Sequence, residues 1–152
     1  MEHITDCKIE QDRPTAVTIG NFDGVHMGHR KHIETTKEYA GRENLKSIVL
    51  TFKPHPMFIF GNRENNALIM SPEEKEIAIG KMGVDTYIEY PFDREFASMS
   101  PEDFAVDIVF NKLKCKVLVV GYDYRFGCMN KGDYKLLERL GKEHGVKTVF
   151  IP

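Results

Sequence analysis

The side chains best suited to chemistry lie close together in residues 20–29, where His26 and His29 flank Gly28 within a glycine-rich segment. An imidazole donates a hydrogen bond when it is neutral and carries positive charge when it is protonated, so both forms suit an anion. A helix that begins near Gly28 would direct its unpaired N–H groups and the positive end of its dipole at the same point. The segment therefore predicts a phosphate-binding turn in which both rings face one anion.

The remaining histidines and a metal site form the alternative interpretation of this segment. His3, His32 and His144 are interpreted as caps or packing residues. His26, His29 and His32 recur every three residues and on a helix could share one face, where they could bind a metal ion. No nearby cysteine or carboxylate completes a convincing ligand set, and the glycines are explained better by phosphate than by zinc. Phosphate is therefore the preferred ligand class.

The elements that must position these residues are strands alternating with helices. Between apolar runs rich in β-branched residues lie stretches that are mostly long enough for a helix, which predicts an α/β fold with a Rossmann-like parallel sheet. Right-handed crossovers then place helices on both faces, and ligands bind beyond the carboxyl ends of the strands. The five predicted strands are residues 15–19, 47–52, 86–90, 117–120 and 147–151.

Four helices are expected between these strands. The first covers residues 28–39, directly after the first strand, with Gly41 near its end. Ser71 and Ser100 each precede a proline and an acidic residue three positions later, which is typical of a capped helix start. The last helix covers residues 134–144, where a stripe of leucines is interpreted as core packing and a following glycine as the stop.

Length, composition and charge favour one ordinary domain. The chain has 152 residues, of which 41% are hydrophobic and 29% charged, with a formal net charge of -2. This charge gives no reason to expect a nucleic-acid or anionic-membrane surface. No stretch resembles a signal peptide or a spanning helix, so a cytoplasmic location is expected. Cys7, Cys115 and Cys128 are predicted to be free thiols.

The motif of residues 20–29 also carries a family resemblance. Its sequence, Gly-Asn-Phe-Asp-Gly-Val-His-Met-Gly-His, resembles the G-x-F-D-G-x-H-x-G-H signature of the nucleotidyltransferase superfamily. Within the superfamily the chain is similar to the FAD synthetase (FMN adenylyltransferase) module of prokaryotic bifunctional riboflavin kinase/FAD synthetases. Further segments that resemble this module in order and spacing are residues 51–56, 92–97, 119–127 and 131–133.

This resemblance implies a sheet order and a set of site residues. Counting the five strands along the chain, the implied order is 3-2-1-4-5, which places the ends of the first and fourth strands side by side. The histidine motif and residues 121–127 would then converge on one cleft. His26 and His29 are the implied catalytic residues, and with Gly28 they bind the triphosphate. The other implied nucleotide- or flavin-binding residues are Gly20, Asn21, Phe22, Asp23, Gly24, His55, Gly121, Asp123, Arg125 and Phe126.

The implied chemistry is adenylyl transfer from ATP to FMN, giving FAD and pyrophosphate. The phosphate of FMN is already ionised, so catalysis should come from positioning and charge stabilisation, with a Mg²⁺ held mainly by phosphate oxygens. Two alternatives stay open. One is another small-molecule adenylyl- or cytidylyltransferase, and the other is a non-catalytic ATP- or flavin-binding module.

Two departures from the family pattern qualify the resemblance. A second family signature, I-S-S-T-x-I-R after the fifth strand, and the riboflavin kinase domain that normally follows it are not among residues 1–152. We expect these 152 residues to be one nucleotidyltransferase domain of a longer protein, with the kinase domain in cis. Lys53 stands where many members have an acidic residue, so no role is inferred for its side chain.

Overall fold

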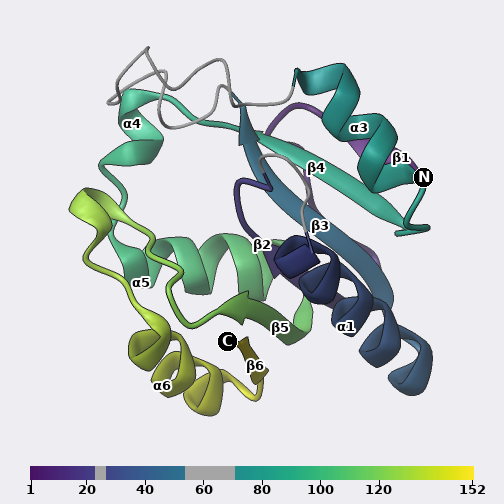
Figure 1. Ribbon diagram of the computed structural model, residues 1–152. Coiled ribbons are helices and arrows are strands. Elements are labelled where there is room, and N and C mark those ends of the chain that lie inside the picture. The colour runs from purple at the N-terminus through teal and green to yellow at the C-terminus, as the bar shows by residue number, and fades with distance from the viewer. Residues whose placement is uncertain (23–26, 54–70) are drawn as a thin grey trace.

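The computed structural model describes residues 1–22, 27–53 and 71–152. Its centre is an all-parallel sheet of six strands in the order β1-β4-β3-β2-β5-β6 (Figure 1). The strands are β1 (Glu2–Ile4), β2 (Thr15–Ile19), β3 (Lys46–Lys53), β4 (Thr86–Pro91), β5 (Cys115–Gly121) and β6 (Lys147–Ile151). For the five predicted strands this is the expected order, with β2 and β5 adjacent at the centre.

The expected count of five strands was wrong, because β1 adds a sixth at the edge beside β4. Its register pairs Glu2 with Thr86 and Ile4 with Ile88. A strand of three residues is too short to show an alternating pattern, and its position depends on a partner more than 80 residues away in sequence. The family-implied arrangement of the remaining strands is unaffected.

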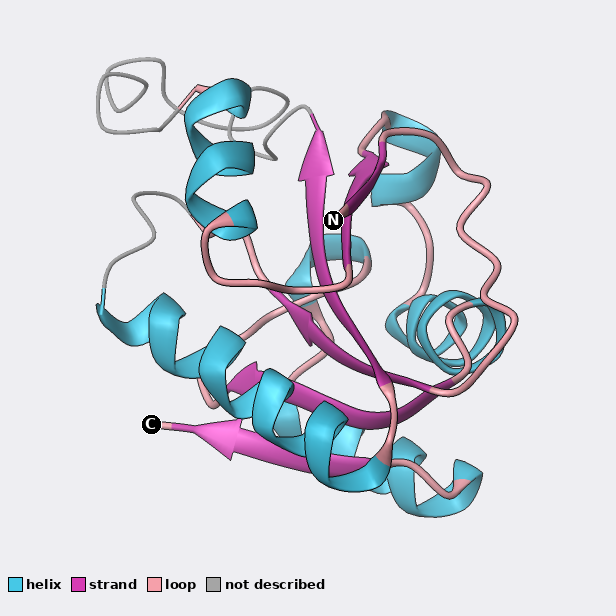
Figure 2. Ribbon diagram, turned by 90° about the vertical axis from the view of Figure 1, so that its right-hand side faces the viewer, coloured by secondary structure: helices cyan, strands magenta, loops and turns pink. Residues whose placement is uncertain are grey.

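Helices cover both faces of the sheet. Figures 1 and 2 show α1 (Met27–Glu43) and α3 (Pro72–Gly80) on one face, with the remaining helices on or beside the other. Those remaining elements are α4 (Arg94–Ala97), α5 (Pro101–Asp103), the π-helix η3 (Phe104–Lys112), the 3-10 turn η4 (Cys128–Asn130) and α6 (Tyr134–His144). Because helices cover both faces of the sheet, all five residues of β2 are buried. This explains why the β2 sequence does not alternate between apolar and charged residues.

The predicted helix boundaries are mostly confirmed. The Ser71 side chain accepts a hydrogen bond from Glu74 N, and Ser100 likewise accepts from Asp103 N, so both serines cap helices. α6 has the predicted bounds and ends at a left-handed glycine. α1 is longer than predicted, because Gly41 stays helical and the left-handed residue that follows the helix is Asn44, with φ 56°.

The main hydrophobic core lies between the sheet and η3 and α6. It combines inward side chains of β2, β3 and β5 with Phe104 and Ile108 of η3 and Leu137 of α6. Smaller clusters under α1 and α3 close the opposite face. In the described part of the chain, no helix is long and apolar enough to cross a membrane.

Candidate functional site

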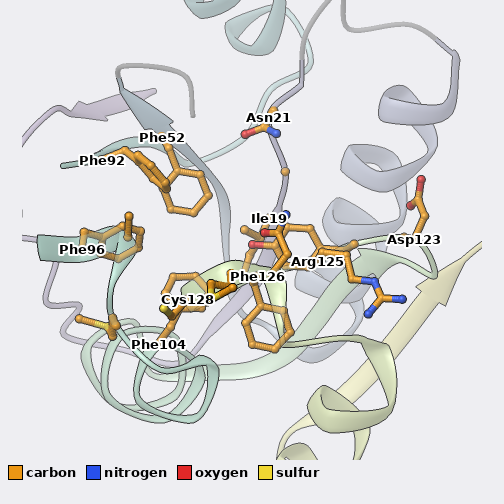
Figure 3. A pocket seen from close by; sticks show the side chains of 18 of the residues that line it. Ile19, Asn21, Phe52, Phe92, Phe96, Phe104, Asp123, Arg125, Phe126 and Cys128 are labelled. Atoms are coloured by element: carbon orange, nitrogen blue, oxygen red, sulfur yellow. The ribbon is translucent and has the colours of Figure 1, made fainter. Parts of the chain in front are cut away.

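A cavity of about 1130 Å³ opens at the carboxyl ends of β2, β3 and β5. This is where ligands bind in open parallel sheets, beside the point at which the strand order reverses. Figure 3 shows Phe52, Phe92, Phe96 and Phe104 gathered on one side of the cavity and Asp123 and Arg125 on the other. The cavity therefore has an aromatic half and a polar half.

The turn after β2 forms one wall of the polar half. Gly20 N–H donates to Leu50 O at 3.2 Å, which fastens the turn to the end of β3. Phe22 has a left-handed backbone, with φ 53°, and its ring is buried under α1 and α3. Gly20, Asn21 and Phe22 all line the cavity, and their binding of nucleotide or flavin stays a prediction of the resemblance.

Two histidines of α1 reach the cavity from the first turns of the helix. The ring centroids of His29 and His32 are 6.2 Å apart, and the His29 ring meets the Phe22 ring edge-on at 5.3 Å. His32 was interpreted as a cap or packing residue, and its place in the cavity wall was missed. The spacing of three residues was the available signal, because it places both rings on one face of a helix.

β5 delivers Gly121 and Asp123 to the same place. A Cβ atom on Gly121 would lie 2.6 Å from Asp123 Oδ1 and 3.4 Å from His32 Cε1. Only glycine leaves room for a carboxylate and an imidazole to approach this close to the strand end. The predicted convergence of the two chain segments is confirmed for the described residues, since His29 and Asp123 line one cavity.

A short bridge shapes the segment that follows β5. Phe126 and Gly132 exchange two backbone hydrogen bonds, of 3.3 and 2.8 Å, and form an antiparallel bridge. The Tyr124 ring stacks on the Phe126 ring, with the ring centroids 5.6 Å apart and the ring planes at 8° to each other. Burial raises the pKa of the Tyr124 hydroxyl, so this group stays a neutral hydrogen-bond donor. Arg125 is exposed and also lines the cavity.

The aromatic half is a cluster of phenylalanines from several elements. The Phe96 ring of α4 lies 5.6 Å from Phe52 of β3, 5.6 Å from Phe92 and 5.7 Å from Phe104 of η3. Such a surface suits a planar aromatic ligand, which can stack or meet the rings edge-on. Sequence reasoning named Phe52, Phe92 and Phe96 only inside family-like segments and missed Phe104, whose contacts depend on how η3 packs on the sheet.

Several implied site residues lie outside the described part of the chain. These are Asp23, Gly24, His26 and His55. Gly28 is in the first turn of α1, where the predicted helix start is confirmed. Across residues 1–22, 27–53 and 71–152, no group of three or more His, Cys, Asp or Glu side chains is placed to hold a metal ion.

Comparison with known families identifies the chain. The family model for FAD synthetase matches residues 8–152, nearly the whole sequence. The chain belongs to the FAD synthetase family. A curated relative, the bifunctional riboflavin kinase/FMN adenylyltransferase of Escherichia coli strain K12, is 38% identical over 129 residues, which cover 85% of this chain and 41% of the relative. The protein of the same name from Listeria monocytogenes is 36% identical over 123 residues, covering 80% of this chain and 38% of that one.

The chain thus spans about two fifths of the length of these two relatives. A solved structure from Streptococcus pneumoniae, titled as a macrolide-efflux protein, matches the fold with a TM-score of 0.83. The two sequences are 23% identical, and the match covers 100% of this chain and 50% of the solved one. At this identity the match supports the fold alone, and it agrees with the Rossmann-like α/β class predicted from the sequence.

Proposed function

We propose that this domain transfers the adenylyl group of ATP to FMN, giving FAD and pyrophosphate. The observation that carries the proposal is the two-part cavity, whose lining combines residues 20–22 and two histidines of α1 with a cluster of phenylalanines. A volume of about 1130 Å³ lies slightly above the usual range for a pocket that holds one ligand, which suits two ligands bound together. The names of the curated relatives agree with this reaction.

The polar half is assigned to the triphosphate. α1 begins at Met27 and points the positive end of its dipole toward the turn that follows β2. His29 and His32 add two imidazoles to the cavity lining, and Arg125, which also lines the cavity, supplies a permanent positive charge. We include His26 on the strength of the family signature.

The aromatic half is assigned to a planar ring, with the isoalloxazine of FMN as the candidate. Phe52, Phe92 and Phe96 present mutually tilted or perpendicular faces, so a flat ligand can contact ring faces and edges together. Tyr124, which also lines the cavity, contributes a hydroxyl that burial keeps neutral by raising its pKa. This division would aim the phosphate of FMN toward the triphosphate.

The reaction requires one bond to form and one to break. An oxygen of the FMN phosphate attacks the α-phosphorus of ATP, and the bond from that phosphorus to the pyrophosphate oxygen breaks as its electron pair leaves with pyrophosphate. No general base is required, because the attacking phosphate is already ionised. The chain's own part is to align the two phosphates and to neutralise the charge that grows on the leaving group, through His26, His29 and the amides near Gly28.

Asp123 makes the site compatible with Mg²⁺. It is the one carboxylate among the described residues that line the cavity. Mg²⁺ is usually held by one or two carboxylates together with substrate phosphates and water, so this donor set fits the ion. When bound, the ion would supply further neutralisation of phosphate charge.

The test follows FAD and pyrophosphate separately. The protein is incubated with ATP, Mg²⁺ and either FMN or phosphopantetheine, and FAD is measured by chromatography. FMN-dependent FAD formation supports the proposal. Pyrophosphate released only with phosphopantetheine would favour another adenylyltransferase, and ATP binding without turnover would favour a binding module.

A histidine variant tests the site within the same assay. Replacing both His26 and His29 by alanine should lower the rate about a hundredfold or more, because preorganised donors to a charged transition state have this effect. Thermal unfolding should change little. Calorimetry with ATP and Mg²⁺ provides a readout that does not depend on turnover. Equal ATP binding by the wild type and the double variant would refute the assignment of the polar half.

The proposal extends to a riboflavin kinase activity in the same polypeptide. The curated relatives are named for both activities, and this chain aligns with about two fifths of their length. A kinase domain in cis would produce FMN close to the cavity that consumes it. Sequencing the complete gene product tests this extension directly.

A further inference from the structure

Lys75 of α3 is a charged side chain buried between that helix and the sheet. Only 5% of its surface is exposed, and lysine is almost never buried to this degree without a partner for its charge. Its Nζ donates a hydrogen bond of 2.9 Å to the main-chain carbonyl of Asn21. α3 therefore reaches the turn that follows β2, where the polar half of the cavity begins.

Other contacts hold the same turn from β3. Thr51 Oγ1 donates to Asn21 O at 3.4 Å, a longer contact than that of Lys75. One residue earlier, Gly20 N–H donates to Leu50 O. Two hydrogen bonds thus connect the turn to β3, and one hydrogen bond from the Lys75 ammonium connects it to α3.

The strain in the next residue explains why the turn needs these ties. Phe22 has φ 53°, and a non-glycine residue in this region costs about 1–3 kcal/mol and persists only where its surroundings hold it. The Phe22 ring packs in the same cluster as Ile79 of α3 and Ile33 of α1. Because Lys75 and Ile79 are four residues apart, one face of α3 holds both the backbone of the turn and its buried ring.

We propose that Lys75 is a positioning residue for the triphosphate, an inference that rests on the proposed function. A carbonyl oxygen bonded to the ammonium cannot turn toward an incoming phosphate, which it would repel. The same bond holds residues 20–22, the described part of the turn after β2, in place where they line the cavity. The buried positive charge also lies directly behind the turn that meets the phosphates.

The inference predicts a selective effect on nucleotide binding. Losing a hydrogen bond from a charged donor should weaken ATP binding about tenfold to a hundredfold. The loss should shrink from ATP to ADP to AMP as phosphates are removed. FMN affinity should stay within about twofold, because the phenylalanine wall has no contact with α3 among those described. A residue with a purely structural role would weaken both ligands together.

The experiment compares three substitutions with the wild-type protein. Lys75→Met keeps most of the length and removes the charge and the donor, while Lys75→Arg keeps both. Lys81→Met is the matched control, because Lys81 caps the end of the same helix with an exposed side chain. Hydrogen exchange of residues 15–22 is measured without ligand, and calorimetry measures ATP, AMP and FMN binding with Mg²⁺.

In Lys75→Met we expect faster exchange in residues 19–22, weaker ATP binding and retained FMN binding, with recovery in Lys75→Arg and no change in Lys81→Met. Unchanged exchange or unchanged ATP affinity in Lys75→Met, beside normal wild-type binding, would overturn the role of Lys75 and leave the proposed function standing. Equal losses for ATP and FMN would also overturn it.

Two further outcomes keep the inference falsifiable. If Lys75→Met does not fold, Lys75→Gln, which removes the charge and keeps a neutral donor, must show a smaller but still selective loss of ATP binding or the inference fails. A wild-type protein that binds neither ATP nor FMN would overturn the proposed function and this inference with it.

Discussion

Replacing Gly127 by alanine should destabilise the domain through two separable effects. Gly127 has φ 78° and ψ -179°, a backbone conformation available almost only to glycine. A Cβ atom there would lie 2.6 Å from Pro101 Cα and 2.7 Å from Pro101 N. These atoms belong to the backbone at the start of α5, so relief of the overlap must move a helix rather than a flexible side chain.

Two other glycines separate the two effects. Gly145 has φ 70° with no atom within 4 Å of the added Cβ, so Gly145→Ala carries the backbone cost alone, about 1–2 kcal/mol. Gly41 is exposed within α1 and also has open space around it, so Gly41→Ala should stabilise the protein by about 0.5–1 kcal/mol. For Gly127→Ala, about 1–3 kcal/mol of strain adds to about 1–3 kcal/mol of overpacking.

The assay is urea unfolding, with thermal unfolding as a second measure. For a domain of this size about 1 kcal/mol corresponds to roughly 2–4 °C in Tm, so Gly127→Ala should lower Tm by about 10 °C. Gly145→Ala should lower it by a few degrees, and Gly41→Ala should raise it slightly. Gly127→Ala with the same stability as Gly145→Ala would refute the overlap with Pro101, and a destabilised Gly41→Ala would refute the whole series.

The Gly127 substitution should also alter the cavity. Cys128 N–H donates to Met99 O at 2.8 Å, and both residues line the cavity next to the displaced backbone. A shift of Pro101 therefore reaches the aromatic half, where FMN is proposed to bind. FMN affinity should fall more than ATP affinity, the reverse of the pattern expected for the Lys75 variants.

Three further predictions follow from burial. In the native protein, thiol reagents should label exposed Cys7 well before Cys115, because Cys115 is buried and burial raises the pKa of its thiol. The denatured protein without reductant should show all three thiols, including that of Cys128. A smaller count would reveal a disulfide. Because the folded thiol of Cys115 keeps its proton while the unfolded thiol ionises above its ordinary pKa of 9.0, the stability that it contributes is fully present below pH 9.0 and is lost as pH rises. Above pH 9.0 the Cys115 thiol should lower the unfolding free energy by about 1.4 kcal/mol per pH unit. A Cys115→Ala variant whose unfolding free energy falls with pH at the same slope as that of the wild type would contradict this assignment. Phe22→Ala should cost about 3–5 kcal/mol in urea unfolding, since the ring is 1% exposed, and a loss below about 1 kcal/mol would refute its anchoring role.

Features determined by nearby residues were predictable from the sequence. Ser71 and Ser100 cap helices through hydrogen bonds to residues three positions later, so the whole interaction lies within four residues of sequence. The order of the five longer strands came from the family resemblance rather than from periodicity. The convergence of His29 and Asp123 followed from that order.

Features that depend on contacts across the chain were not predictable in the same way. Lys75 resembles any exposed helical lysine in sequence, and only the packing of α3 on the sheet reveals its bond to Asn21. β1 is too short to show a pattern. His32 is the intermediate case, because its spacing from His29 was visible but a lone histidine is more often a packing residue.

The edge strand β1 also bears on how the protein avoids association with other chains. Without it, residues 86–88 of β4 would present a row of unpaired N–H and C=O groups, which is a template for pairing with a strand of another molecule. His3 fastens this cover: its ring stacks on Tyr87 at 5.0 Å, and its Nε2 lies 2.6 Å from the buried carboxylate of Glu89. β1 thus replaces the first half of the β4 edge by an edge strand of three residues, and very short edge strands are one way in which proteins limit edge-to-edge pairing.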